Sequence, residues 1–375
     1  MKKELSRLVR LLASGEPVSG RVLGEEIGVS RTSVSKWVSQ LGGFGMTVKR
    51  KAGVGYCLTD PLQLLQSDTV RKRLGDSAGR IISLDIFDSI ASTNTWAMES
   101  LRRQLGDSDT IKPIAQDENN GFVVVLAEHQ SSGRGRRGRS WVSPYAANIN
   151  LSLSVRVYKS ISDLSGLSLA IGIAIVKVLH AHKFIEARLK WPNDVLIDGR
   201  KLAGVLVDAQ GEMDGPVDLC IGVGLNVRMQ ASEVAGLISQ PWISLEEAAD
   251  AKQLVVPERS LLAADLISEI SKTVDLFMRH GFAYFQPAWS EFDAFADEVL
   301  ELSTQLDPDS SRSAEDNRLP ISAGLNMGVD EEGRLLMRPL DSEVALAYSG
   351  GEISVRRRKT KAEKQNSPAD DGLTE

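Results

Sequence analysis

The segment most suited to chemistry is residues 133–138, which read GRGRRG. Its glycines let backbone amides approach a ligand closely, and its guanidinium groups offer paired donors to carboxylate and phosphate oxygens. It is not a Walker loop, and a Rossmann helix would not begin with so many exposed arginines. A flexible basic surface loop is the alternative. An anion-binding loop is favoured because the segment follows a strand-like run that ends near Gln130 and precedes Trp141 and Pro144.

A second motif, KWPND at residues 190–194, leads into a hairpin whose return strand begins KLAG at Lys201. This hairpin can bring the Asp194 carboxylate and the Lys201 ammonium together. The lysine could stabilise charge that develops on a phosphoryl group, and the aspartate could hold magnesium or orient an incoming amine. Alternatively, Trp191 and Pro192 anchor a turn and the charged pair is solvated. The hairpin alone supports both interpretations.

The third motif is Ser92, Thr93 and Asn94, which follows a strand-like run and precedes a helix. By itself it is typical of a helix N-cap. Its hydroxyl and amide groups could also bind a polar ring such as a ureido group. The spacing does not choose between these interpretations.

Some reactive groups are absent from the sequence. It holds no G-x-S-x-G elbow, no metal-ligand pattern among its four histidines and no cysteine beside the three motifs. We therefore expect no covalent acyl-enzyme. Clustered cations and glycines without a nucleophile favour a site that brings two anions together and neutralises their repulsion.

The elements that must position these motifs begin near Ile81, where strand-like runs alternate with helices. This pattern predicts an α+β domain with a mixed sheet. The apolar stretch from 164 to 179 contains serines, glycines and a lysine, so we expect a buried helix and no membrane span. No export signal is visible. Only Cys57 and Cys220 are present, which excludes a disulfide framework and favours the cytoplasm.

The first sixty residues have a different pattern. Apolar residues recur at helical spacing in three segments, Gly28 supplies a tight turn and Ser30 can cap the third helix. This predicts a helix-turn-helix, followed by two short strands around a wing between Met46 and Leu58. The outward residues proposed to contact DNA are Arg31, Thr32, Ser35, Lys36, Lys49, Arg50 and Lys51.

Charge supports that assignment. Ten lysines and arginines against four glutamates give residues 1–58 a net charge of +6, whereas the whole chain carries −6, which leaves −12 for the remainder. Basic charge is thus concentrated where a phosphate backbone would need it. The alternative is a winged helix used for protein contacts, because the scaffold does not by itself establish function.

In order, the winged helix, STN, GRGRRG, KWPND, KLAG, GVGLN and GGEISVR resemble the bifunctional biotin-protein ligase and biotin-operon repressor family across nearly the whole chain. The resemblance implies biotin and ATP as substrates, with Mg²⁺, and biotinyl-5'-AMP as the intermediate. It also implies a biotin carboxyl carrier domain, operator DNA and a second copy of the chain as partners.

The same resemblance implies roles for individual residues. The biotin-binding set is Ser92, Thr93, Asn94, Gln130, Gly133, Arg134, Gly135, Arg136, Lys201, Gly204 and Gly222. The adenylate-binding set is Asn193, Asp194, Asn226, Trp242 and Arg356. The catalytic set is Arg134, Arg136, Asp194 and Lys201. No resident metal site is expected.

The resemblance also divides the chain. We expect a winged helix-turn-helix at 1–65, a biotin/lipoyl-ligase catalytic domain at 66–298, an SH3-like barrel at 299–356 and a disordered tail at 357–375. Two polar insertions, 102–120 and 309–317, depart from the compact family pattern and are expected to form mobile loops.

Two rival functions stay open. Lipoate or octanoate attachment uses a related fold and also modifies an acceptor lysine. A non-enzymatic ligand-sensing repressor is the other, although the four catalytic candidates weigh against it. We also hypothesise that the adenylate orders residues 133–138 and so favours dimers that fit a palindromic operator.

Overall fold

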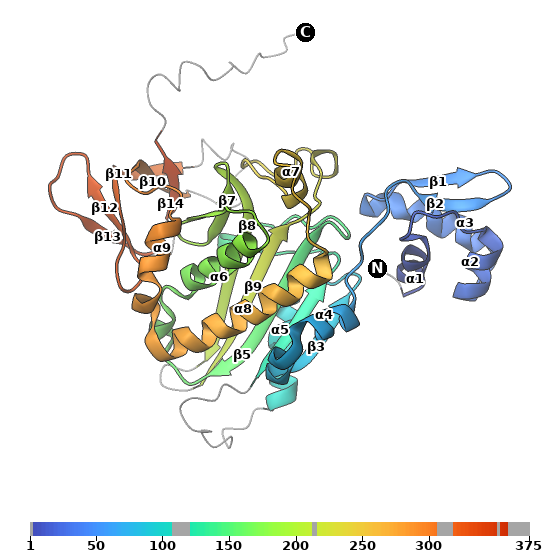
Figure 1. Ribbon diagram of the computed structural model, residues 1–375, viewed down its shortest axis with the longest axis horizontal. Coiled ribbons are helices and arrows are strands. Elements are labelled where there is room, and N and C mark those ends of the chain that lie inside the picture. Colours follow the sequence, from blue (N-terminus) through green and yellow to red (C-terminus); the bar gives the residue numbers. More distant parts are fainter. Residues whose placement is uncertain (1–2, 107–120, 212–215, 306–317, 351–352, 359–375) are drawn as a thin grey trace, which may run out of the picture.

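The computed structural model describes residues 3–106, 121–211, 216–305, 318–350 and 353–358. These residues form a helical N-terminal unit, a central sheet covered by helices, and a smaller C-terminal sheet (Figure 1). The insertion expected at 309–317 lies outside the described residues, as do residues 107–120 of the insertion expected at 102–120 and residues 359–375 of the tail expected at 357–375. Residues 102–105 belong to the helix Thr93–Leu105 and Arg357 to the strand Ser354–Arg357, so the expected loop and tail do not begin where the sequence suggested. The predicted order of a helix-turn-helix followed by a mixed-sheet α+β domain is confirmed.

The N-terminal unit is a three-helix motif with a two-stranded wing. The Ser30 side chain accepts a hydrogen bond from the Ser33 amide at 3.2 Å and so begins the third helix, as its sequence position predicts. Gly28 ends the second helix in the left-handed region, at φ +81°, where an L side chain would be strained. The elements are α1 (Lys3–Leu12), α2 (Gly20–Ile27), α3 (Arg31–Gln40), η1 (Leu41–Phe44), β1 (Val48–Lys51) and β2 (Gly55–Leu58).

In the part of the chain that the structure describes, the central sheet has seven strands, of which only the first two in space, β3 and β4, are parallel neighbours and every other pair is antiparallel. The sheet is therefore mixed, as predicted. In spatial order its strands are β3 (Ile81–Phe87), β4 (Phe122–Ala127), β5 (Asn148–Val157), β9 (Val217–Asn226), β8 (Arg200–Gly211), β7 (Asp194–Ile197) and β6 (Arg188–Lys190).

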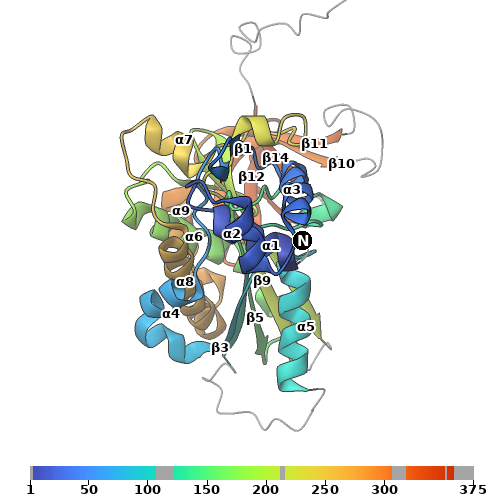
Figure 2. The ribbon, with the colours of Figure 1, turned by 90° about the vertical axis from the view of Figure 1, so that its right-hand side faces the viewer.

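Helices cover both faces of this sheet (Figure 2). One face carries α5 (Thr93–Leu105), and the other carries α4 (Ser67–Leu74), α6 (Leu167–Ala181) and α8 (Arg259–His280). The span Ile161–Ala181 is long and apolar enough to cross a membrane, but 67% of its most apolar window is buried inside the molecule. It therefore packs as the buried helix that the sequence predicts. The remaining helices are η2 (Gly75–Arg80), η3 (Arg136–Gly138), η4 (Ile161–Leu164), η5 (Ala231–Glu233), α7 (Leu245–Asp250), η6 (Phe282–Tyr284) and α9 (Gln286–Phe292).

The C-terminal sheet has five antiparallel strands and is open in the part of the chain that the structure describes. Its edge strands β13 and β14 do not pair with each other there, so the SH3-like barrel is not confirmed. In spatial order the strands are β13 (Leu346–Tyr348), β12 (Leu335–Pro339), β11 (Arg318–Val329), β10 (Val299–Gln305) and β14 (Ser354–Arg357).

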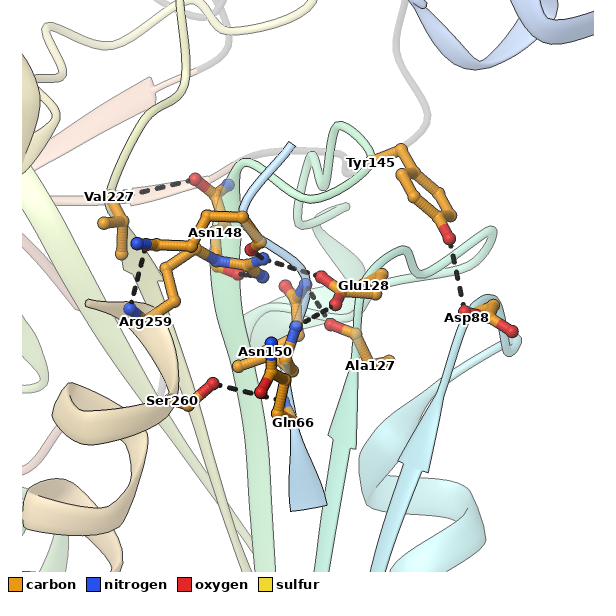
Figure 3. Close-up of polar contacts among 12 residues, drawn as sticks. Gln66, Asp88, Ala127, Glu128, Tyr145, Asn148, Asn150, Val227, Arg259 and Ser260 are labelled. Carbon is orange, nitrogen blue, oxygen red and sulfur yellow. Dashed lines mark hydrogen bonds and ion pairs between the residues drawn. The ribbon is translucent and has the colours of Figure 1, made fainter. Parts of the chain in front are cut away.

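A buried ion pair ties the linker after the winged helix to the central domain (Figure 3). Arg259 Nη1 lies 2.7 Å from Glu128 Oε2, and the two side chains are 0% and 1% exposed. Arg259 also donates to the Gln63 carbonyl at 2.7 Å, and Glu128 accepts from the Leu65 amide at 2.5 Å. Because both ions are held by several hydrogen bonds, the linker is a packed part of the core.

The winged helix also contacts the central domain directly. Arg10 pairs with Asp88 at 2.7 Å, and Asp88 accepts from the Tyr145 hydroxyl at 3.3 Å. Phe44 meets the His129 ring edge-on at 5.7 Å between centroids. His129, two residues after the end of β4, therefore contacts the winged helix, while the next residue, Gln130, belongs to the candidate site.

Candidate functional site

The candidate site begins where α5 crosses the polar face of the sheet. Gln130 Oε1 accepts from the Thr93 amide at 2.8 Å. Ser152 Oγ lies 2.6 Å from Asn94 Oδ1 and 2.8 Å from Thr93 Oγ1. Ser92 occupies the N-cap position but makes no capping hydrogen bond with its side chain. The predicted N-cap position is therefore confirmed, but without the side-chain hydrogen bond that usually accompanies it.

Two glycines of β9 let side chains lie against the sheet. A Cβ at Gly222 would be 2.2 Å from Asn94 Oδ1, and one at Gly224 would be 2.3 Å from the Trp141 ring. Trp141 in turn donates to Asn150 Oδ1 at 3.2 Å. Any side chain at either glycine would displace the polar groups above it, so these positions require glycine.

The β7–β8 hairpin brings Asp194 and Lys201 together. Lys201 Nζ lies 2.6 Å from Asp194 Oδ1, and the side chains are only 17% and 15% exposed. The pair is thus largely withdrawn from solvent, which argues against the solvated-pair interpretation. Lys201 Nζ also lies 5.7 Å from the centre of the Trp141 ring, a cation–π contact. Trp141 therefore lies between the hairpin and Asn150 of the polar site. Gly204 packs under Lys201, because a Cβ there would be 3.2 Å from Nζ.

Residues 133–138 form a compact turn beside this hairpin. The Gly135 amide donates to the Arg139 carbonyl at 2.6 Å, and Arg137 has a φ of +59°. A Cβ at Gly133 would be 2.5 Å from the Trp141 carbonyl oxygen, so the turn is closed against the tryptophan. These contacts place the loop against Trp141 and the residues that follow it.

The arginines of this turn point in different directions. Arg136 Nη1 donates to Asn193 Oδ1 at 3.3 Å, and its Nη2 contacts the Gly350 carbonyl. Burial lowers the pKa of Arg136, and the Asp194 carboxylate partly offsets that effect. Arg134 Nη2 lies 2.7 Å from Asp208 Oδ2. One arginine thus faces the hairpin and the other faces the polar site.

A cavity of about 190 Å³ lies on the far side of Arg136. Ser168 and Pro192 of the central domain form one part of its wall, and Arg334 and Gly350 of the C-terminal region form another. The cavity therefore lies between the two. Together with the hydrogen bond of 3.0 Å from Arg137 to Ser354 Oγ, it shows that the C-terminal sheet packs against the arginine turn.

The remaining adenylate candidates are Trp242, Asn226 and Arg356. Trp242 forms a bridge with Lys201, whose amide donates to the Pro241 carbonyl at 3.0 Å. Asn226 is buried and donates to the Ile243 carbonyl at 3.1 Å. Arg356 is an exposed residue of β14, two positions from Ser354.

Sequence reasoning missed several residues of the site. Asn150 and Ser152 could have been found, because alternation in NINLSLSVRV places them on one strand face. Trp141 and Asp208 had no comparable signal. The expectation that no cysteine lies beside the motifs is wrong, since Cys220 Sγ is 3.7 Å from the Asn94 carbonyl oxygen. Burial raises the pKa of this thiol, which keeps it protonated and unreactive.

The seven residues proposed to contact DNA are all exposed. They comprise Arg31, Thr32, Ser35 and Lys36 on α3, and Lys49, Arg50 and Lys51 on β1. The apolar residue between them on α3, Val34, is fully buried. The third helix therefore presents a face of cationic and hydroxyl-bearing side chains. The basic strand β1 of the wing follows it in the sequence after η1.

Comparisons with known proteins agree with this arrangement. Residues 89–226 match the Biotin/lipoate A/B protein ligase family, and residues 4–57 match a helix-turn-helix (HTH) domain family. The chain is 34% identical to the bifunctional ligase/repressor BirA of Salmonella typhimurium over 93% of this chain and 96% of that protein. It is 33% identical to BirA of Escherichia coli over the same shares.

The fold agrees as well. A biotin protein ligase from Aquifex aeolicus, solved in complex with biotin and ATP, superposes with a TM-score of 0.54 at 21% identity and covers 74% of this chain and all of that one. Taken with the full-length relatives, the chain belongs to the family of bifunctional biotin ligase/repressors.

Proposed function

We propose that this chain is an ATP-dependent biotin-protein ligase and also a biotin-responsive transcriptional repressor. The observation that carries the ligase half is the largely buried Asp194–Lys201 pair beside Arg136. Lys201 lies against the Trp141 ring, and hydrogen bonds through Asn150 and Gln130 link Trp141 to Thr93 in the polar cluster. Cations are thus assembled beside groups that can hold an uncharged polar ring. Such a site can activate the carboxylate of a ring-bearing acid.

In the binding step, the ring end of biotin would lie against α5. Ser92, Thr93, Asn94 and Gln130 would bind the ureido ring, and the close backbone at Gly133, Gly135, Gly204 and Gly222 would form the walls. Hydroxyl and amide groups suit that ring, because it has one acceptor oxygen and two N–H donors. The hydrogen bonds among Thr93, Gln130 and Ser152 support this assignment, since they hold those groups in place before the ligand arrives.

In the first chemical step, an oxygen of the biotin carboxylate attacks the α-phosphorus of ATP, and pyrophosphate leaves. Arg134, Arg136 and Lys201 would neutralise the carboxylate and phosphate oxygens, which otherwise repel each other. Asn193, Asn226, Trp242 and Arg356 would hold the adenylate. The product is the mixed anhydride biotinyl-5'-AMP.

In the second step, the amine of an acceptor lysine on a biotin carboxyl carrier domain attacks the carbonyl carbon of the anhydride. An amide forms, AMP leaves and the amine gives up a proton. Asp194 would orient that amine, because its carboxylate accepts hydrogen bonds only.

Magnesium would accompany ATP. Among the described residues there is no group of three or more histidines, cysteines or carboxylates that could hold a metal ion. Mg²⁺ usually keeps several waters and takes one or two carboxylates with substrate phosphates, and Asp194 fits that pattern. The ion would supply further neutralisation of the phosphate charge.

The repressor half rests on the exposed cationic face of α3 and the wing. We propose that adenylate occupancy orders residues 133–138 and favours a dimer whose two winged helices fit a palindromic operator. In the described part of β8, residues 206–211 pair only with β9, because β7 pairs with residues 200–204 and the Val205 amide donates to the Asn193 carbonyl. An unpaired strand edge of this kind can dock against a second copy.

We also propose a cytoplasmic location and closure of the C-terminal sheet into an SH3-like barrel, together with the domain boundaries given from the sequence. The two edge strands of the C-terminal sheet, β13 and β14, are both short, which supports closure into a small barrel.

Pyrophosphate exchange into ATP tests the ligase half. We expect exchange that depends on biotin and not on lipoate. Exchange with lipoate instead would support the rival ligase, and exchange with neither would support a non-enzymatic repressor. Sedimentation and operator binding, each with and without biotin and ATP, test the repressor half; association that ignores the ligands would reject the proposed coupling.

A further inference from the structure

Asp208 on β8 joins the two ends of the candidate site, although no motif marks it. Its Oδ2 accepts from Asn94 Nδ2 at 3.0 Å and lies 2.7 Å from Arg134 Nη2. The Asp208 side chain is 24% exposed, whereas that of Arg134 is 50% exposed. One carboxylate oxygen thus serves both the group assigned to the ring and the group assigned to the substrate carboxylate.

Asp208 determines how the Asn94 amide is turned. A carboxylate can only accept, so the Asn94 Nδ2 group must face it. Asn94 Oδ1 is then left for the Ser152 hydroxyl at 2.6 Å, and it lies too close to Gly222 for any other side chain to fit. With Thr93 and Gln130, these residues form one connected series of hydrogen bonds that ends at Arg134.

The contact with Arg134 has a different consequence. A guanidinium binds a carboxylate through paired N–H groups. In this structure, the carboxylate that Arg134 contacts is that of Asp208. A substrate carboxylate that binds Arg134 must therefore compete with Asp208 and come close to its negative charge. Because the pair is partly exposed, the exchange is possible at modest cost.

We propose that Asp208 is a positioning residue that holds Asn94 and Arg134 in the ligand-free site and gives up Arg134 to the carboxylate of the incoming acid. The inference rests on the proposed function, in which that acid is biotin. Asp208 keeps Asn94 throughout. Binding of the acid thus moves Arg134, and with it the turn at residues 133–138, from an internal carboxylate to the substrate.

The test compares Asp208→Asn with the wild-type chain, using biotin and its uncharged alcohol, biotinol, as probes in calorimetric titrations. The asparagine amide can still accept from Asn94 but no longer repels a carboxylate or pairs with Arg134. We expect the ratio of the biotinol Kd to the biotin Kd to rise about three- to fivefold, the size of a partly exposed ion pair. A ratio that stays unchanged, or that falls, would overturn the proposal.

Two further variants locate the effect. Asp208→Ala also removes the acceptor for Asn94, so it should weaken both probes, by about tenfold, relative to Asp208→Asn. Asp265→Asn is the matched control, because Asp265 pairs with Arg73 at 2.8 Å with side-chain exposures of 22% and 52%. It lies outside the site and should leave the ratio of the two Kd values unchanged.

A second readout needs no ligand. Hydrogen exchange of the amides in residues 133–139 should be faster in Asp208→Asn than in the wild type and unchanged in Asp265→Asn. If the wild type binds neither probe, the proposed function fails, and this exchange alone decides the inference. Faster exchange then supports the hold on Arg134, and unchanged exchange rejects it.

Discussion

Two arginine–carboxylate pairs of this chain have the same N···O distance and opposite surroundings. Arg259 and Glu128 lie 2.7 Å apart and are 0% and 1% exposed, whereas Arg134 and Asp208 lie 2.7 Å apart and are 50% and 24% exposed. The first pair is closed in by the linker, and every further hydrogen bond of its two ions in the described residues is to protein groups, so no ligand can replace either partner. The second can exchange its partner for a ligand. Distance alone therefore does not separate a structural pair from a functional one; access to solvent and to substrate does.

The largest effect should come from breaking the buried pair. Glu128→Gln leaves the Arg259 charge in the core without its counter-ion, which costs about 3–5 kcal/mol. We expect a clear fall in the midpoint of urea unfolding. Asp265→Asn, in a partly exposed pair, should shift it far less. Equal shifts for the two variants would contradict the distinction between the pairs.

The Asp194–Lys201 pair is intermediate, since it is mostly buried but borders the site. Lys201→Ala removes a charge that acts on the developing phosphate charge and should lower the adenylation rate by about two to three powers of ten. Circular dichroism and the unfolding midpoint should remain close to those of the wild type. Near-normal pyrophosphate exchange in this variant would refute the catalytic role of the lysine.

Close packing around Asn94 gives a smaller effect. In Gly222→Ala the new Cβ would meet Asn94 Oδ1 at 2.2 Å, and relieving that clash costs about 1–3 kcal/mol. We expect the biotin Kd to rise by about ten- to a hundredfold at most. Gly79→Ala, where no atom lies within 4 Å, is the control. Biotin affinity that is equal in both variants would remove Asn94 from the site.

The smallest effect concerns pH at the junction with the winged helix. Burial lowers the pKa of His129, so the folded chain favours the neutral ring. Its contribution is present above the ordinary histidine pKa of about 6.5 and is lost as the pH falls through the lower folded value. His129→Phe should flatten this part of the stability–pH curve, measured by thermal unfolding between pH 5 and 7. A curve identical to that of the wild type would exclude His129 as the cause.

The sequence predicted the elements better than their contacts. The helices of the N-terminal unit follow from apolar spacing and from Ser30, and the buried helix follows from the composition of residues 164–179. Both are local signals. The Glu128–Arg259 pair joins residues that are 131 positions apart, and only the folded chain shows why a glutamate at the end of an apolar strand is buried.

In the candidate site, too, local motifs could be predicted and contacts between distant residues could not. GRGRRG and KWPND were recognisable because several constrained residue types occur together. Asp208 is a single acidic residue near the end of a strand, and its role depends on Asn94 and Arg134 from two other segments. Cys220 was thought remote for the same reason, since neighbouring strands bring it beside Asn94. Ser92 occupies a capping position, but its side chain makes no capping hydrogen bond, which the residue type alone could not show.

The most direct test of the account is mass spectrometry of a biotin carboxyl carrier fragment incubated with this chain, ATP and equal concentrations of biotin and lipoate. The account predicts a single biotinyl adduct on one lysine of the fragment, absent without ATP and strongly reduced with Lys201→Ala. A lipoyl adduct, or an unmodified fragment, would contradict it.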